Sequence, residues 1–268
     1  MVFHSTADVQ HGEQLKSLRD MQESLAGCAR LMVHSVGDLN RLKDFGLRDN
    51  LLMFPHGVID TPPPAPGLRQ QAANLSGKTV IASYGFLLPH KGMPELIEAF
   101  ALLAKKDPKM HLLLVNAEYP VPVSAELAET CRQRIAQPDL AGRVTLITDY
   151  LTDEESLAWL GIADAIVFPY QHTQESSSAA VRWGLSTGRP VFCTPLAIFE
   201  DVAEAVTFLP GTDSVSMADG LYINLQRGST ALQENWLRNH GWTTVSARLR
   251  NVLLALSAEN PKTLTHNV

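Results

Sequence analysis

The sequence predicts an α/β protein in which helices flank parallel sheets. Short apolar runs of strand length alternate with segments of helical period along the chain, a pattern typical of repeated strand-helix-strand units. Start and stop signals for helices fall between those runs, independently of the apolar pattern. Hydrophobic residues make up 45% of the 268 residues and charged residues 19%, an ordinary balance for a chain that fills a large core.

Nine strands are expected, each a short apolar run bounded by polar residues, glycine or proline. They lie at residues 1–4, 30–34, 51–54, 78–84, 111–116, 143–148, 165–168, 190–194 and 206–209. Because parallel strands need a crossover connection, we expect helices in the segments between them.

Three helices carry boundary signals of their own. Ser35 is suited to cap a helix that Gly46 ends, and Pro94 suits the first turn of another. Thr152 and Glu155 have the spacing of a capping box. The helix after Pro94 has an apolar face formed by Leu96, Ile97, Phe100 and Leu103.

A proline cluster marks the main break in the chain. Residues 62–66 hold four prolines in five positions, which disfavours both helix and central strand. We therefore predict a partial Rossmann-like N-terminal domain at 1–60, a proline-rich linker at 61–76, a complete Rossmann-like α/β domain at 77–230, and C-terminal helices and tail at 231–268. The tail carries an apolar stripe of Val245, Leu249, Val252, Leu253 and Leu256 that must pack on another element.

Composition excludes several classes of function. A net charge of -6 argues against nucleic-acid binding, which needs a basic footprint. Three widely spaced cysteines without metal-ligand spacing favour reduced thiols. The start lacks the features of a signal peptide, and no apolar run of about 18 residues occurs. We expect a soluble, cytoplasmic protein, and contact with a membrane surface stays open.

The turn after the strand at 78–84 is the first candidate site. Gly85 and Lys91 follow that strand closely, and ligands of doubly wound sheets bind at the carboxyl ends of strands. There a glycine lets the backbone approach a ligand and a lysine can neutralise a diphosphate. A surface lysine beside a turn glycine would show the same pattern.

The second candidate site follows the strand at 165–168. Glu175 precedes Ser176, Ser177 and Ser178 at the expected start of a helix, where unpaired backbone N–H groups and the helix dipole attract anions. A carboxylate beside such a start can accept hydrogen bonds from sugar hydroxyls. The simpler alternative is that Glu175 and Ser176 only cap the helix.

Among the histidines, His4 ranks first because it ends the first strand and precedes a polar segment. His34, His56, His90 and His172 also lie beside loops. The sequence lacks a nucleophile elbow, a His-x-x-x-His pair, a P-loop and a three-glycine dinucleotide motif, which disfavours hydrolase, zinc, P-loop and dehydrogenase functions. No metal or other cofactor is expected.

The residues resemble a retaining glycosyltransferase of family 4, with the GT-B fold of two facing Rossmann-like domains. The segments Arg30–Ser35 and Pro55–Val58 are similar to the end of that family's acceptor domain, and residues 78–226 to its donor domain. The Lys91-Gly92 turn and the stretches Phe168–Tyr170 and Gly188–Val191 are the most specific marks. The resemblance also implies a truncated N-terminal domain, since only about 60 residues precede the linker where roughly 150 are typical.

The resemblance implies roles for individual residues. A nucleotide sugar would lie in the second domain, with Lys91 on the diphosphate and Glu175 on the sugar hydroxyls. Donors of Ser177 and Ser178 would face the diphosphate, Tyr150 and Leu151 would border the base, and His4 would lie near the reacting sugar.

Two positions depart from that family's pattern. Trp183 stands where a second glutamate is common, and Phe86 where an arginine is common. Arg182 is a candidate to compensate for the missing cation.

The leading hypothesis is a glycosyltransferase that transfers a sugar from a nucleotide-diphosphate donor to a glycan or lipid-linked acceptor with retention, in polysaccharide or glycoconjugate biosynthesis. The alternative is a non-catalytic GT-B-like module that binds a nucleotide sugar or a protein within a larger assembly, as a homo-oligomer or with a partner subunit. A sugar-nucleotide epimerase of the same fold is a third hypothesis, but we locate no acid and base residues for it.

Overall fold

The computed structural model describes residues 1–60, 72–173, 175–225 and 231–259, and it divides into two compact units. Unit 1 contains residues 1–60, 174–177 and 237–268, and unit 2 contains residues 61–173 and 178–236. Most of the predicted linker lies outside the described residues, and its last part forms a short 3₁₀ helix, η2 (Ala73–Leu75).

Unit 1 is built on a three-stranded parallel sheet in the order β1-β4-β5. The strands are β1 (Val2–Phe3), β4 (Leu31–Val33) and β5 (Leu51–Met53). An antiparallel hairpin, β2 (Val9–His11) and β3 (Gln14–Lys16), follows β1. The hairpin turns at Gly12, whose φ of 62° suits glycine.

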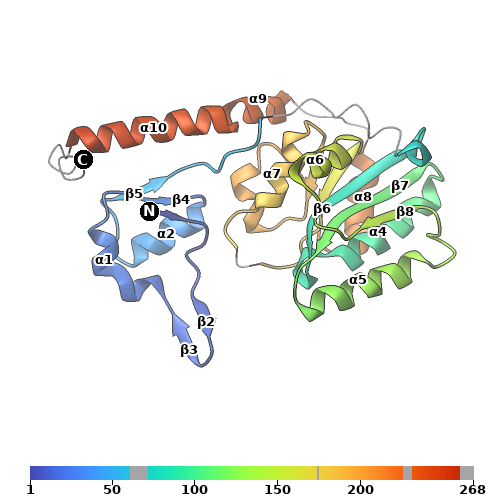
Figure 1. Ribbon diagram of the computed structural model, residues 1–268, viewed down its shortest axis with the longest axis horizontal. Helices are drawn as coiled ribbons and strands as arrows, with labels where there is room; N and C mark the ends of the chain where they lie inside the picture. The colour runs from blue at the N-terminus through green and yellow to red at the C-terminus, as the bar shows by residue number, and fades with distance from the viewer. Residues whose placement is uncertain (61–71, 174, 226–230, 260–268) are drawn as a thin grey trace. The chain divides into compact units, whose positions relative to one another are not determined.

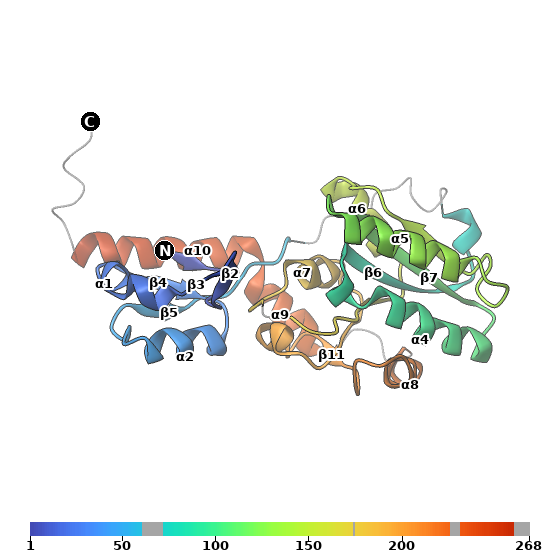
Figure 2. The same ribbon diagram turned by 90° about the horizontal axis from the view of Figure 1, so that it is seen from below.

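Helices cover both faces of this small sheet, as Figures 1 and 2 show. Leu31 and Val33 of β4 share one buried cluster with Leu42 of helix α2 (Val36–Asp44), whereas Met32 packs with Val245 of helix α10 (Trp242–Glu259). Alternate residues of a strand point to opposite faces, so β4 contacts helices on both sides. The remaining elements of unit 1 are η1 (Leu18–Met21) and α1 (Gln22–Ala26).

The tail holds two helices, α9 (Ala231–His240) and α10, with a break at Gly241. A side chain at Gly241 would overlap the carboxylate of Asp60. That carboxylate accepts a hydrogen bond of 2.6 Å from the Thr243 hydroxyl in the first turn of α10. The predicted apolar stripe is confirmed in α10 at Val245, which is 1% exposed, and at Leu249 and Val252, which pack against the same cluster. It is wrong at Leu253, which is 52% exposed.

Unit 2 contains a parallel sheet of six strands in the order β11-β10-β9-β6-β7-β8. The strands are β6 (Thr79–Leu87), β7 (Met110–Glu118), β8 (Val144–Ile147), β9 (Ala165–Phe168), β10 (Val191–Cys193) and β11 (Thr207–Phe208). The chain begins the sheet at β6, adds β7 and β8 on one side, and then returns to add β9 on the other. The strand order therefore reverses between β6 and β9.

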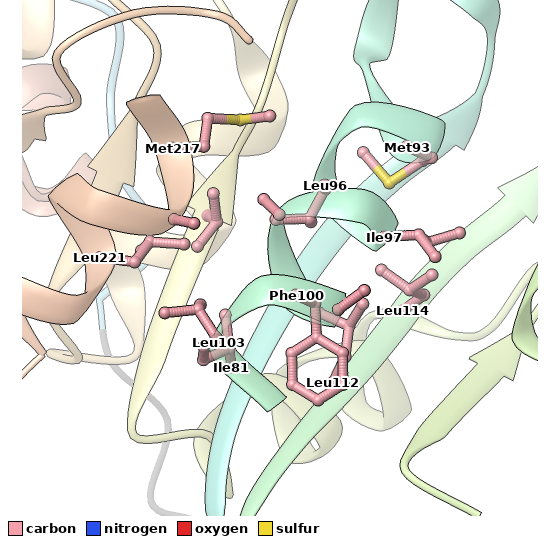
Figure 3. Close-up of a cluster of buried hydrophobic side chains, with 14 of the residues drawn as sticks. Ile81, Met93, Leu96, Ile97, Phe100, Leu103, Leu112, Leu114, Met217 and Leu221 are labelled. Carbon is pink, nitrogen blue, oxygen red and sulfur yellow. The ribbon is translucent and has the colours of Figure 1, made fainter. Parts of the chain in front are cut away.

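The helices of unit 2 pack on both faces of its sheet. Those helices are α4 (Met93–Lys106), α5 (Pro122–Ile135), α6 (Asp153–Gly161), α7 (Ala179–Ser186) and α8 (Ser214–Asn224), with 3₁₀ helices η3 (Pro89–Lys91) and η4 (Ala197–Val202). Figure 3 shows Phe100 of α4 and Met217 of α8 in one core with Ile81 of β6. On the other face, Tyr84 of β6 contacts Trp183 of α7.

All nine expected strands are confirmed, as is the α/β fold. The predicted caps are also confirmed: Ser35 accepts a hydrogen bond from the Asp38 amide, Thr152 and Glu155 form the capping box, and Pro94 lies in the first turn of α4. The β2-β3 hairpin was not predicted, because its exposed, mostly polar strands bury no apolar face.

Candidate functional site

The carboxyl ends of β6 and β9 meet at the point where the strand order of unit 2 reverses. In open α/β sheets the two connections leave such a point in opposite directions, and ligands bind in the crevice between them. The connection after β6 carries Lys91, and the connection after β9 carries Tyr170.

The Lys91-Gly92 turn lies directly against the end of β9. Gly92 has a φ of 74°, and a side chain there would overlap the carbonyl oxygen of Pro169. The Gln171 amide donates a 2.9 Å hydrogen bond to the carbonyl of His90. These contacts fix the backbone that carries Lys91 beside Pro169 and Tyr170.

One buried tyrosine connects the lysine to the start of helix α7. The Lys91 ammonium lies 4.0 Å from the centroid of the Tyr170 ring, a cation–π contact. The Tyr170 hydroxyl, on a residue that is 2% exposed, lies 3.2 Å from the hydroxyl of Ser178. Ser178 caps α7 by accepting a hydrogen bond from the Val181 amide. The cation and the positive end of the helix dipole are therefore held by the same side chain.

Arg182 stabilises the start of α7 through contacts with Ser178 and Asp201. Its guanidinium donates a 2.7 Å hydrogen bond to the Ser178 carbonyl and forms an ion pair with Asp201. The side chains of this pair are 5% and 11% exposed. The donor contact predicted for Arg182 stays a prediction; the structure places its guanidinium against the Ser178 carbonyl and Asp201.

The other predicted donor contacts of unit 2 lie at the carboxyl ends of β6 and β8. Gly85 has a φ of 134° within β6, a conformation that favours glycine. Tyr150 follows β8 and is 80% exposed, and Leu151 beside it is half-buried. Phe86 and Trp183 both contact aromatic rings, with Phe86 5.0 Å from Tyr119 and Trp183 5.7 Å from Tyr84 between ring centroids.

Glu175, Ser176 and Ser177 belong to unit 1, whereas Lys91 and Ser178 belong to unit 2. The exposed Glu175 helps to line a cavity of about 310 Å³ with Ser5, Ala7, Asp8, Val9 and Gln10. The sequence predicted the glutamate and the three serines as one continuous helix start, but α7 begins only after Ser178.

Asp38 anchors the segment that carries Glu175. This carboxylate is 5% exposed and accepts hydrogen bonds from the Thr6 amide at 3.1 Å and the Ser35 hydroxyl at 2.8 Å. Burial raises the pKa of Asp38, but hydrogen bonds from Ser176, Thr6 and Ser35 together hold the pKa below its ordinary value. The charged form is therefore favoured, and Ser176 is held beside it.

His4 lies in a cluster of three histidines at the carboxyl ends of β1, β4 and β5. Its ring centroid lies 5.2 Å from that of His34 and 5.7 Å from that of His56, and the latter two are 5.1 Å apart. His34 is 7% exposed, and its Nδ1 donates to the Phe54 carbonyl at 2.9 Å. Sequence reasoning ranked the histidines one by one and missed this grouping, although each follows a strand of the same parallel sheet.

Within the part of the chain that the structure describes, no group of three or more His, Cys, Asp or Glu side chains is arranged to hold a metal ion. Over the same residues, no helix has the length and apolar character needed to span a membrane.

Several solved structures superpose on this chain and share its fold. The trehalose-phosphate synthase (UDP-forming) of Burkholderia xenovorans, solved with glucose-6-phosphate, superposes with a TM-score of 0.71 at 15% identity over 89% of this chain. HepE of Anabaena, solved with UDP, superposes with a TM-score of 0.72 at 15% identity over 95% of this chain. A glycosyltransferase of Rickettsia africae superposes with a TM-score of 0.74 at 16% identity over 98% of this chain.

This chain spans 63%, 72% and 70% of the lengths of those three proteins. No family model matches the sequence. No curated protein matches it either. At these identities the likeness concerns architecture, and it shows that the chain has the α/β fold of GT-B type.

Proposed function

We propose that the protein is a glycosyltransferase that takes its sugar from a nucleotide-diphosphate donor. The observation that carries the proposal is the convergence of the Lys91 ammonium and the capped start of α7 on Tyr170, at the switch point of the unit 2 sheet. A cation and a helix N-terminus at one crevice suit a diphosphate, since both favour negative charge. Solved structures of similar fold carry UDP and UDP-glucose, in both cases HepE of Anabaena.

The chemistry proposed is substitution at the anomeric carbon with retention, as the resemblance to family 4 suggests. As the bond to the sugar breaks, negative charge grows on the departing diphosphate, and Lys91 and the dipole of α7 would stabilise that charge. Glu175 would accept hydrogen bonds from sugar hydroxyls, and His4 would lie near the reacting sugar. The reaction as proposed needs no metal, because Lys91 supplies the positive charge.

The acceptor side of the proposal involves unit 1. The hypothesis includes a glycan or lipid-linked acceptor. It also includes a role in polysaccharide or glycoconjugate assembly and a cytoplasmic setting. The histidine cluster of His4, His34 and His56 is the polar feature of unit 1 that we expect to lie nearest the acceptor, because it too stands at carboxyl ends of strands.

Isothermal titration against a panel of UDP- and GDP-sugars tests the proposal. We expect saturable binding of at least one donor by the full chain. Lys91→Ala should weaken that binding tenfold or more, since a charge-assisted hydrogen bond contributes about 1.5 to 3 kcal/mol. Glu175→Ala should mainly reduce the rate of transfer. Absence of binding by every donor would defeat the proposal.

A second candidate function is binding without turnover. It is favoured by the aromatic residues Phe86 and Trp183 at positions where the resemblance leads one to expect charged side chains, and by the pairing of Arg182 with Asp201. Incubation of the chain with a donor that it binds, followed by analysis for released nucleotide diphosphate, separates the two. Release of the diphosphate together with a glycosylated product would exclude the binding module.

A further inference from the structure

A cavity of about 330 Å³ lies in unit 2 at the amino ends of three adjacent strands. Its polar lining comes from the segments just before those strands: Ser76 and Lys78 precede β6, Asp164 precedes β9, and Arg189 precedes β10. Because the strands are parallel, this is the end of the sheet opposite the candidate functional site. We call it the amino-end cavity.

The cavity has the size and the walls of a small-molecule site. Ala72, Leu75 and Val80 line it with buried apolar side chains. Small-molecule sites are mostly apolar with a few placed polar groups, and they begin at roughly 300 Å³. The amino-end cavity therefore suits a compact ligand rather than an extended one.

Two of the polar lining residues are fixed by the backbone of the sheet. The Asp164 carboxylate accepts a 2.8 Å hydrogen bond from the Val80 amide. The Arg189 guanidinium donates a 2.8 Å hydrogen bond to the Gly161 carbonyl, and the Arg189 carbonyl accepts a 2.7 Å hydrogen bond from the Gln233 side chain. The cavity thus keeps one carboxylate and one guanidinium in set positions.

The positive charges of the cavity exceed its negative charge. Lys78 and Arg189 are both half-buried, and over the residues that the structure describes neither side chain forms an ion pair. The Lys78 ammonium lies 3.4 Å from Nδ1 of His111, a ring whose pKa is lowered to about 4 and which is therefore neutral. Two cations against the single carboxylate of Asp164 leave the lining with one net positive charge.

This charge pattern favours an anion that also carries hydroxyl groups. Partly buried charges are normally matched by an opposite charge, and a phosphate matches a lysine and an arginine together, since the guanidinium fork fits its oxygens. The Asp164 carboxylate repels a second anionic group but accepts hydrogen bonds from hydroxyls. The Ser76 hydroxyl adds a further donor and acceptor.

We propose that the amino-end cavity is a second ligand site, which binds the phosphate ester of a compact polyol. The phosphate lies between Lys78 and Arg189, the hydroxyl groups face Asp164 and Ser76, and the carbon skeleton lies against the apolar wall. The inference is independent of the proposed function, because the cavity uses no residue assigned to the donor site.

Calorimetric titration of glycerol phosphate and of glycerol tests the inference. The proteins are the wild type, Lys78→Ala, Arg189→Ala and the control Lys105→Ala, which removes an exposed cation of α4 that does not line the cavity. The wild type and the control should bind the ester alike, and neither should bind glycerol. Each cavity variant should bind the ester about 10- to 150-fold more weakly, the loss expected for one charge-assisted hydrogen bond.

His111 supplies a readout of where the ester binds. An anion beside the Lys78 ammonium offsets the positive charge that helps to lower the pKa of His111. NMR titration of the His111 ring in the wild type should therefore give a higher pKa with saturating glycerol phosphate than without it. An unchanged pKa would place the ester away from Lys78 and overturn the assignment.

The remaining outcomes also decide the question. No binding of the ester by the wild type at millimolar concentration, or equal binding of the ester and glycerol, would reject the proposal. Lys91→Ala separates the two ends of the sheet: if it loses the ester while Lys78→Ala keeps it, the ester occupies the donor site and the amino-end cavity is not a phosphate site. Lys78→Ala decides the test should Arg189→Ala fold poorly. Titration with nucleotide sugars tests the proposed function separately, and that function survives each of these failures.

Discussion

At the scale of single residues, Gly92 allows the turn that carries Lys91 to lie directly against Pro169. It combines a φ of 74° with a direct approach to the Pro169 carbonyl. An alanine there would have to adopt a left-handed conformation, which costs about 1–2 kcal/mol, and would also push the turn away from β9.

Gly92→Ala should therefore lower the free energy of unfolding by more than that strain alone and should weaken donor binding. Gly142→Ala is the matched control, since Gly142 has a φ of 73° but has no atom within 4 Å of an added Cβ. Chemical denaturation of both variants measures the difference. Equal losses of stability would show that the contact with Pro169 contributes nothing.

His111 gives the stability of unit 2 a dependence on pH. The His111 side chain lies in β7 and is 2% exposed. Its Nδ1 lies 3.4 Å from the Lys78 ammonium nitrogen, and its Nε2 lies 2.9 Å from the Thr145 hydroxyl oxygen. Burial, with help from the positive charges of Lys78 and Arg143, lowers the pKa of His111 to about 4. The neutral ring is therefore the form that the folded state favours.

Because the pKa is lower in the folded state than in the unfolded state, at about 6.5, the unfolded chain binds the proton first. The stabilisation is complete above pH 6.5 and is lost as the pH falls toward 4, by up to about 3 kcal/mol. Urea unfolding of the wild type and of His111→Gln at pH 7.5 and pH 5 should show a smaller pH effect in the variant. The same pH effect in both proteins would refute this assignment.

At the scale of elements, the start of α7 depends on a buried ion pair. Arg182 lies between the Ser178 carbonyl and Asp201 of η4. Removing one partner leaves a buried charge unmatched, which costs about 3–5 kcal/mol.

Asp201→Ala should destabilise unit 2 by that amount and should reduce donor affinity, because Ser178 loses its support. The control is Asp219→Ala, which breaks the pair of Lys106 and Asp219 whose side chains are 44% and 59% exposed. An exposed pair contributes about 0–1 kcal/mol. Thermal unfolding distinguishes the two variants, and equal midpoints would contradict the role given to Asp201.

The elements show what local sequence can and cannot predict. Strands and caps were predictable because periodicity and capping chemistry act over a few residues, as at Ser35 and Thr152. The direction of the Arg182 side chain was not predictable, because its partner Asp201 is 19 residues away in the sequence. The link from Lys91 through Tyr170 to Ser178 depends on the pairing of β6 with β9, which no single segment encodes.

At the scale of the whole molecule, unit 1 draws its core from both ends of the chain. Met32 and Phe54 pack with Val245 of α10, although Val245 lies far along the chain from both. The backbone of Val58 pairs with both His240 and Trp242. The small sheet of three strands therefore depends on the C-terminal helix for one of its two covered faces.

Val245→Asp should unfold unit 1 while leaving the core of unit 2 intact, because it buries an unpaired charge. Leu253→Asp, on the same helix but 52% exposed, should have little effect. Limited proteolysis with mass spectrometry locates the cleavage sites. Protection of residues 1–60 in the Val245→Asp protein would show that α10 is dispensable for unit 1.

The most direct test of the central claim is a crystal structure of the protein with bound UDP. The account predicts that the diphosphate lies within hydrogen-bonding distance of the Lys91 ammonium and of the first backbone amides of α7, next to Ser178. A diphosphate bound elsewhere, with Lys91 still packed on Tyr170 and no contact to the start of α7, would contradict it.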